Sequence, residues 1–286
     1  MKSRYRIAAP AVLAMALAAS STAQGQSIPL AEVPHIHGIG FGAAVPGSIL
    51  LATHNGVFRA SPDGSATAVS SDRSDYMGFT PDPGDPERLL ASGHPAGGGN
   101  MGVIVSSDGG ATWTQLSTGA GGPVDFHAMT VSRADPGTIY GLYGGIQVSR
   151  DRGATWAVAG PGPERVIDLA ASPTAADVLY AGTAGGLMQS SDAGRTWTLI
   201  GPANVATSMV EATADGSLYA FFVGTGLFTL SAADGKWRAL ANDFGESYVL
   251  HLAADPADPA HLVAVTETSA IIESLDGGKT WEPFGP

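Results

Sequence analysis

The chain contains no cysteine. This absence excludes disulfide bonds, thiolate metal ligands, a cysteine nucleophile and a lipid-modified cysteine. Positive charge is also scarce: 14 Lys and Arg stand against 26 Asp and Glu, giving a formal net charge of -12 at pH 7. Because an acidic surface repels nucleic acid and attracts cations, we expect no DNA or RNA partner.

Long apolar runs are absent beyond the N-terminus. The opening MKSRYRIAAPAVLAMALAASSTAQGQS places Lys2, Arg4 and Arg6 before an apolar run and a small-residue cleavage pattern. This arrangement predicts a secretory signal peptide over 1–23, cleaved near Ala23. No other run approaches the roughly 20 apolar residues that span a bilayer. We therefore expect a secreted or periplasmic protein without a membrane span.

Repetition is the dominant feature of the remaining sequence. SSDGGATW ends at Trp113, SRDRGATW at Trp156, SSDAGRTW at Trp197 and SLDGGKTW at Trp281, while the shortened copy SAADGKW ends at Trp237. Successive tryptophans are 43, 41, 40 and 44 residues apart. An eroded copy, SPDGSATA, lacks the Trp. These copies predict six units of about 42 residues each.

Each unit divides into four short strands. In the fourth unit, VIDLAAS, VLYAGTA, GLMQSSD and TWTLIG are β-rich runs separated by Pro, Gly and Asp of turns. Four-stranded repeats of this length are typical of β-propellers. The sequence therefore predicts an all-β, six-bladed β-propeller over 35–286, preceded by a lead-in over 24–34. We expect one domain and a monomer.

The repeated motif S-x-D-x-G-x-T-W resembles the Asp-box, or BNR repeat, of sialidases, sortilin-type receptors and photosystem II assembly propellers. It fills the turn between the third and fourth strands, where the Asp accepts backbone N–H bonds and the Trp packs between blades. We therefore expect structural roles, and neither catalysis nor calcium binding, for the four Asp-box aspartates: Asp108, Asp151, Asp192 and Asp276.

Most histidines fall where strands of a blade begin or end. In an antiparallel blade, the start of the first strand and the end of the second lie at one end, opposite the Asp-box turn. His261 begins a second strand and belongs to the Asp-box end. The other end is expected to hold five of the seven histidines: His35, His37, His54, His94 and His127.

Alignment of the first strands strengthens this cluster. Placing HIHGIGF, DYMGFTP, DFHAMTV, VIDLAAS and VLHLAAD in register puts five residues at equivalent positions around the channel: His37, Met77, His127, Asp168 and His251. Imidazoles bind copper and zinc, and a thioether adds preference for Cu(I). We predict a copper or zinc site with the five histidines as ligands and Met77 and His251 as supporting residues. The alternative is that each histidine only hydrogen-bonds to backbone or carboxylate.

A closer resemblance involves the histidine-containing segments themselves. HIHGIG, ATHNGVF, YMGF, SGHP and DFHA, in this order, resemble a family of small secreted bacterial BNR-repeat proteins commonly labelled glycosyl hydrolase or exo-α-sialidase. The resemblance spans most of the mature chain. It implies that the residues it covers form one functional region: His35, His37, His54, Met77, His94 and His127.

Two other functions stay open. If the protein is an enzyme, glycosyl hydrolysis of a small carbohydrate would need two facing carboxyl groups. The candidates at the histidine-bearing end are Asp75, Asp125, Asp168 and Glu246. Sialidase chemistry is disfavoured, because only Arg73 and Arg165 lie there where three arginines are needed. The third possibility is a docking platform for an envelope protein.

Overall fold

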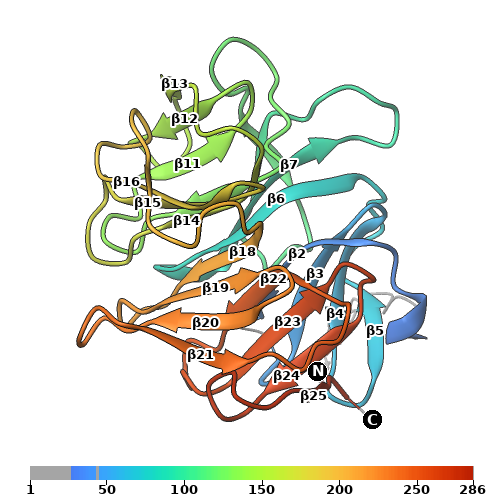
Figure 1. Cartoon of the computed structure of the whole chain (residues 1–286). Helices are drawn as coiled ribbons and strands as arrows, with labels where there is room; N and C mark the ends of the chain where they lie inside the picture. The colour runs from blue at the N-terminus through green and yellow to red at the C-terminus, as the bar shows by residue number, and fades with distance from the viewer. Residues whose placement is uncertain (1–26, 43–44, 286) are drawn as a thin grey trace, which may run out of the picture.

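The computed structural model describes residues 27–42 and 45–285 and shows an all-β molecule (Figure 1). Six antiparallel sheets surround a central axis, which confirms the predicted six-bladed β-propeller. Within the described ranges the single helical segment is the 3-10 turn η1 (Leu30–Glu32), and no helix there could cross a membrane. The predicted signal peptide over 1–23 lies outside the described residues.

Blades 1 to 3 follow one another along the chain. Blade 1 consists of β2 (Ile36–Phe41), β3 (Ile49–Thr53), β4 (Gly56–Ala60) and β5 (Ser65–Ala68). Blade 2 consists of β6 (Asp75–Asp82), β7 (Asp85–His94), β8 (Val103–Ser106) and β9 (Thr114–Ser117). Blade 3 consists of β10 (Met129–Val131), β11 (Ile139–Leu142), β12 (Ile146–Ser149) and β13 (Ala157–Gly160).

Blades 4 to 6 repeat the pattern, with blade 6 lying beside blade 1 (Figure 1). Blade 4 consists of β14 (Val166–Ala171), β15 (Leu179–Thr183), β16 (Gly186–Ser190) and β17 (Thr198–Leu199). Blade 5 consists of β18 (Thr207–Ala212), β19 (Leu218–Phe222), β20 (Gly226–Leu230) and β21 (Trp237–Ala241). Blade 6 consists of β22 (Val249–Ala254), β23 (Leu262–Thr266), β24 (Ile271–Ser274) and β25 (Glu282–Pro283).

Burial is high on the inner strands of each blade and low on the fourth strand at the rim. The second strand β3, with sequence ILLAT, is buried at every residue, because blades cover both of its faces. The outer strand β9, with sequence TQLS, is exposed or half-buried throughout. The apolar second strand and the polar fourth strand therefore match their radial positions in these two blades.

Hydrophobic cores lie between the blades. Within the described residues, each of the six clusters of buried apolar side chains joins two adjacent blades. Trp113 packs against the cluster between blades 1 and 2, and Trp281 against the cluster between blades 5 and 6. Burying apolar surface contributes about 25 cal/mol per Å2, so the contacts between neighbouring blades hold the ring together.

The ring closes by packing between blades 6 and 1. All four strands of blade 6 come from the C-terminal segment, and Phe284 and Val265 join Ile36 and Leu51 in one core. The predicted lead-in over 24–34 contains the short strand β1 (Ser27–Pro29), which pairs with the outer edge of β5. Blade 1 therefore has five strands.

The four complete Trp-containing turns share one hydrogen-bond pattern. Asp108 Oδ1 accepts from Ser106 Oγ at 2.8 Å and from Thr112 N at 2.9 Å, and Asp108 Oδ2 accepts from Thr112 Oγ1 at 2.6 Å. The same contacts recur at Asp151, Asp192 and Asp276. In the eroded copy of blade 1, Asp63 instead bonds to Ser65 two residues on.

The aspartates of these turns should cause the free energy of unfolding to fall at acid pH. Hydrogen bonds from Thr196 and Ser190 lower the pKa of Asp192 to about 2 from an ordinary value of 3.8. A lowered native pKa gives stabilisation that is complete above about pH 4 and is lost as the pH falls through about 2. Asp192→Asn should therefore lower the urea midpoint at pH 6 and reduce its change between pH 6 and pH 3.

The control for this prediction is Asp243→Asn, since Asp243 is exposed and its carboxylate accepts no hydrogen bond from the described residues. The control should follow the wild-type pH dependence. If Asp192→Asn and Asp243→Asn altered the pH dependence of the urea midpoint equally, the hydrogen bonds of the turn would not be its cause.

Candidate metal centre at the histidine end

The histidines gather at the end of the propeller where first strands begin and second strands finish, here called the histidine end. His35 and His37 lie at the start of β2, His54 follows β3, and His94 ends β7. His127 lies two residues before β10 rather than on its first residue. Four of the five histidines fall into two groups, each built around one aspartate, and His35 lies beside the first group.

The first group consists of His37, His54 and Asp75. His37 Nε2 lies 3.0 Å from His54 Nδ1 and 3.6 Å from Asp75 Oδ1, and His54 Nδ1 lies 3.1 Å from Asp75 Oδ2. One ligand atom from each of the three residues falls within 4.8 Å of the others. Blades 1 and 2 thus supply two nitrogens and one oxygen facing a common point.

His35 supports the first group without joining it. Its ring stacks on His54 with a centroid distance of 5.6 Å and meets His37 edge-on at 5.0 Å. Its Nδ1 lies 3.1 Å from Ser269 Oγ, and that hydroxyl also accepts a hydrogen bond from Ile36 N. Ser269 therefore links blade 6 to the start of β2. Nothing in the turn sequence ETSA indicates this role.

The second group consists of His94, Asp125 and His127. The two Nε2 atoms lie 3.0 and 2.9 Å from the same oxygen, Asp125 Oδ2. His94 Nδ1 lies 2.8 Å from the Gly99 carbonyl oxygen, in the glycine-rich loop between β7 and β8. The hydrogen bond to Gly99 and the Asp125 carboxylate raise the pKa of His94.

The strand register corrects part of the predicted alignment. Asp168 pairs with Gly182 and His251 pairs with Val265, so these two residues are equivalent as predicted. In β2 the paired residue is Gly38, opposite Ala52, and His37 occupies the bulge position. The predicted equivalence of His37 with Asp168 and His251 is therefore wrong by one residue, because Ile36 is the residue equivalent to Val166 and Val249, and the same bulge follows all three.

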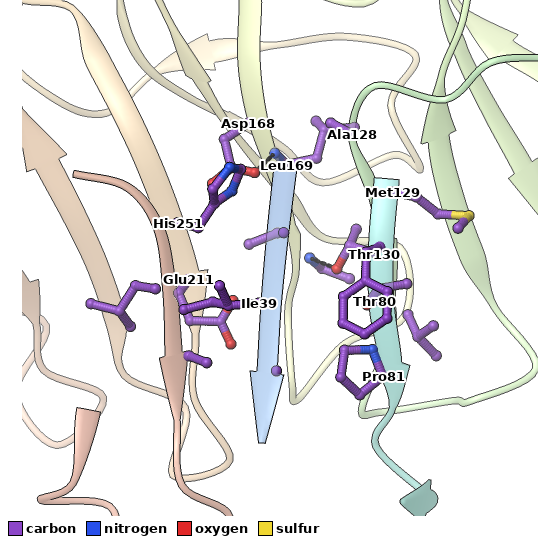
Figure 2. A pocket seen from close by; sticks show the side chains of 18 of the residues that line it. Ile39, Thr80, Pro81, Ala128, Met129, Thr130, Asp168, Leu169, Glu211 and His251 are labelled. Carbon is purple, nitrogen blue, oxygen red and sulfur yellow. Dashed lines mark hydrogen bonds between the residues drawn. The ribbon is translucent and has the colours of Figure 1, made fainter. Parts of the chain in front are cut away.

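A channel cavity of about 360 Å3 runs inward from the histidine end. His37, His127 and His251 line it together with Asp168 and Glu211. In Figure 2, Asp168 and His251 lie near the start of the pale blue strand β2, which carries Ile39. Glu211, which belongs to β18, lies beside a later part of β2. Sequence reasoning missed Glu211, although an acidic residue within the mostly buried strand TSMVEA was the available signal.

Burial in the channel shifts the pKa values of these groups. Burial and the charge of His54 lower the pKa of His37 to about 4, and burial with the charge of His37 lowers that of His251 to about 4. Burial raises the pKa of Asp168 to about 7 and that of Glu211 to about 8. Asp168 also accepts hydrogen bonds from Leu169 N and Val210 N, which fasten blade 5 to blade 4.

The remaining predicted residues make none of the contacts that define the two groups. Met77 pairs with Ser92 two residues beyond Asp75 on β6, so both side chains point to the same side of the strand. Glu246 is exposed in the loop before β22. His261 lies at the opposite end of the propeller, 3.3 Å from Asp255 and 3.4 Å from Glu273.

Comparison with known proteins identifies the fold only. No family model matches the chain, and no curated protein matches it. Similar solved structures include a GH74 enzyme from Niastella koreensis, with TM-score 0.61 and 18% identity over 87% of this chain and 45% of that one. A GH74 xyloglucanase from Xanthomonas campestris gives TM-score 0.58 and 22% identity over 90% of this chain and 46% of that one. The chain thus spans less than half the length of either enzyme.

A structure of YCF48 bound to D1 peptide is also similar, with TM-score 0.56 and 17% identity over 90% of this chain and 84% of that one. At such identities these likenesses show the propeller fold and carry no activity or partner to this chain.

The shifted histidines provide a test of the site geometry. In metal-free protein the imidazoles of His37 and His251 should titrate with midpoints near 4, because burial disfavours their charged forms. An unfolded histidine titrates near 6.5, so these groups should destabilise the native state as the pH falls from about 6.5 towards 4. Long-range nitrogen–proton NMR, assigned with His37→Ala and His251→Ala, measures the midpoints. Midpoints near 6.5 would contradict the buried geometry.

Proposed function

We propose that the protein binds a divalent copper or zinc ion through His37, His54 and Asp75. The observation that carries this proposal is the convergence of three ligand atoms within 4.8 Å. Asp75 Oδ1 is buried and has no hydrogen-bond partner among the described residues. Since a buried polar oxygen without a partner costs free energy, a cation at this point would stabilise the site.

The donor set suits a borderline divalent ion. Two imidazole nitrogens and one carboxylate oxygen are typical ligands of Zn2+ and Cu2+, and three protein ligands leave a coordination position open. A histidine must be neutral to bind a metal, and the lowered pKa of His37 keeps it neutral at pH 7. No thiolate is present in the sequence to favour Cu(I).

Glycoside hydrolysis is less well supported by the geometry. Asp75 and Asp125 are each occupied by two imidazoles, and Asp168 accepts two backbone hydrogen bonds. Tyr76 and Phe126, the aromatic residues next to Asp75 and Asp125, are 1% and 0% exposed and so offer no face on which a sugar could stack. Similarity to the GH74 enzymes and to YCF48 supports neither hydrolysis nor peptide docking beyond the fold.

Metal titration tests the proposal. Protein starting near Gln24, without a histidine tag, is titrated with Zn2+ and Cu2+ at pH 7.5 and then dialysed for elemental analysis. His37→Ala/His54→Ala should lose one equivalent of the tightly bound ion, whereas His261→Ala, at the other end of the propeller, should retain it. Equal metal content in wild type and the double variant would overturn the proposal.

His35 provides a graded test of the same site. It contacts both histidine ligands but contributes no converging atom, so it acts as a positioning residue. His35→Ala should weaken Zn2+ binding about 10- to 100-fold, as loss of outer partners commonly does, without changing the stoichiometry. His37→Ala should reduce the affinity much more. If His35→Ala instead lost the bound equivalent of Zn2+, His35 would be a ligand and not a positioning residue.

A further inference from the structure

The channel cavity supports an inference that does not depend on the metal site proposed above. We propose that the channel binds a small aliphatic amine, whose ammonium group faces Glu211 and Asp168. The cavity of about 360 Å3 lies near the lower end of the range of roughly 300–1,000 Å3 that is typical of small-molecule sites. Its size therefore fits a small ligand.

Small residues leave this space inside the ring. At one level of the channel, a residue of each first strand pairs with the residue after the first buried residue of its second strand. All six of these first-strand residues line the cavity: Gly40, Thr80, Thr130, Ala170, Glu211 and Ala253. Three of the six are Gly or Ala, and two carry short hydroxyl side chains. Glu211 is thus the one long side chain at this level (Figure 2).

The two carboxyl groups of Asp168 and Glu211 differ in the hydrogen bonds that they accept. Asp168 Oδ1 accepts from Leu169 N and Asp168 Oδ2 accepts from Val210 N, each at 2.9 Å. The carboxyl group of Glu211 accepts no hydrogen bond from the described residues, and only the charges of Arg133 and Asp168 act on it. A ligand that donates hydrogen bonds would supply the partner that Glu211 lacks.

The charge of the lining favours a cation. Asp82, Asp168 and Glu211 line the cavity, whereas Arg133 is the one Arg or Lys among the lining residues. Asp82 is already paired with two arginine side chains. Arg133 acts on Glu211 through its charge without a hydrogen bond. The net charge of -12 adds to this preference, because an acidic protein raises the local concentration of cations.

The pKa of Glu211 distinguishes a cationic from a neutral ligand. Burial raises this pKa to about 8, although the charge of Arg133 acts in the opposite direction. Most Glu211 carboxyl groups are therefore protonated at pH 7 without a ligand. An ammonium group favours the ionised carboxylate, so its binding should displace the proton, whereas a neutral ligand would leave it in place. Besides Asp168, the other titratable groups that line the channel with Glu211 and Arg133 are His37, Asp82, His127 and His251.

An amine fits this lining better than a metal ion does. In the described part of the chain, the ligand atoms of Asp168, Glu211 and His251 do not converge within 4.8 Å as those of the first group do. Aliphatic side chains, including Ile39 and Leu169, also line the cavity (Figure 2). An ammonium group can donate three hydrogen bonds, and its carbon chain can lie against the aliphatic side chains.

Calorimetric titration with a matched pair of probes tests the inference. Metal-free protein starting near Gln24 is titrated at pH 7 with 1,4-diaminobutane and with its neutral analogue 1,4-butanediol, in about 0.15 M NaCl to screen surface charges. The amine should bind about 10- to 100-fold more tightly than the diol, because hydrogen bonds between charged groups are the stronger ones. Amine binding should also release protons, seen as different heats in Tris and phosphate buffers. No binding of the amine, or equal affinity for both probes, would overturn the inference.

Glu211→Gln locates the amine, because it keeps the shape of the side chain and removes its charge. The variant should bind 1,4-diaminobutane about 10- to 100-fold more weakly while retaining the wild-type circular dichroism spectrum. Glu246→Gln, in the exposed loop before β22, is the control and should bind as wild type does. Equal affinity in Glu211→Gln and wild type would overturn the inference. If Glu211→Gln misfolded, the comparison of the two probes on wild type would decide.

The Zn2+ titration separates this inference from the proposed function. Glu211→Gln should retain the one equivalent of Zn2+ expected at His37, His54 and Asp75, whereas His37→Ala/His54→Ala should still bind 1,4-diaminobutane. Either proposal can therefore fail without the other. Loss of amine binding in His37→Ala/His54→Ala with the circular dichroism spectrum unchanged would place the amine at the histidines and contradict the inference.

Discussion

The structure depends on the mutual covering of apolar blade faces. Each four-stranded blade exposes two apolar faces, and each face is buried only when the next blade packs against it. A row of blades would leave its first and last faces exposed, so closure between β22 and β2 completes the burial. Closure also forces six first strands to meet around one axis, which brings residues far apart in sequence to one end.

Close approach of the first two blades sets the geometry of the histidine end. A Cβ atom on Gly38 would lie 2.9 Å from Phe79 Cβ, and one on Gly40 would lie 2.4 Å from Pro81 Cγ. Glycine at both positions of HIHGIGF therefore lets β2 lie against β6. His37 at the start of β2 can then reach Asp75 at the start of β6. The same short segment therefore supplies His37 and the space in which His37 meets Asp75.

The repeats allowed the blades to be predicted, because the Trp-containing turn recurs once per four strands and fixes both spacing and strand order. Strand polarity then placed the histidines at one end. The division into two groups was not predictable, since it depends on which aspartate each imidazole faces. The channel alignment was wrong by one residue, because Ile36 and not His35 corresponds to Val166 and Val249. Ser269 was missed because it approaches His35 from a blade 234 residues away in sequence.

The two kinds of aspartate in this acidic chain differ in their hydrogen-bond donors. In the Trp-containing turns, both oxygens of Asp276 accept bonds from Ser274 and Thr280, so local donors satisfy the carboxylate. Asp75 and Asp125 face imidazoles, and each keeps one buried oxygen without a donor from the described residues. A carboxylate saturated by its own turn gains little from a cation, whereas a cation beside Asp75 would supply the partner that this carboxylate lacks. Net negative charge attracts cations to the whole surface, but this difference in local donors separates the carboxylates of the histidine end from those of the Asp-box turns.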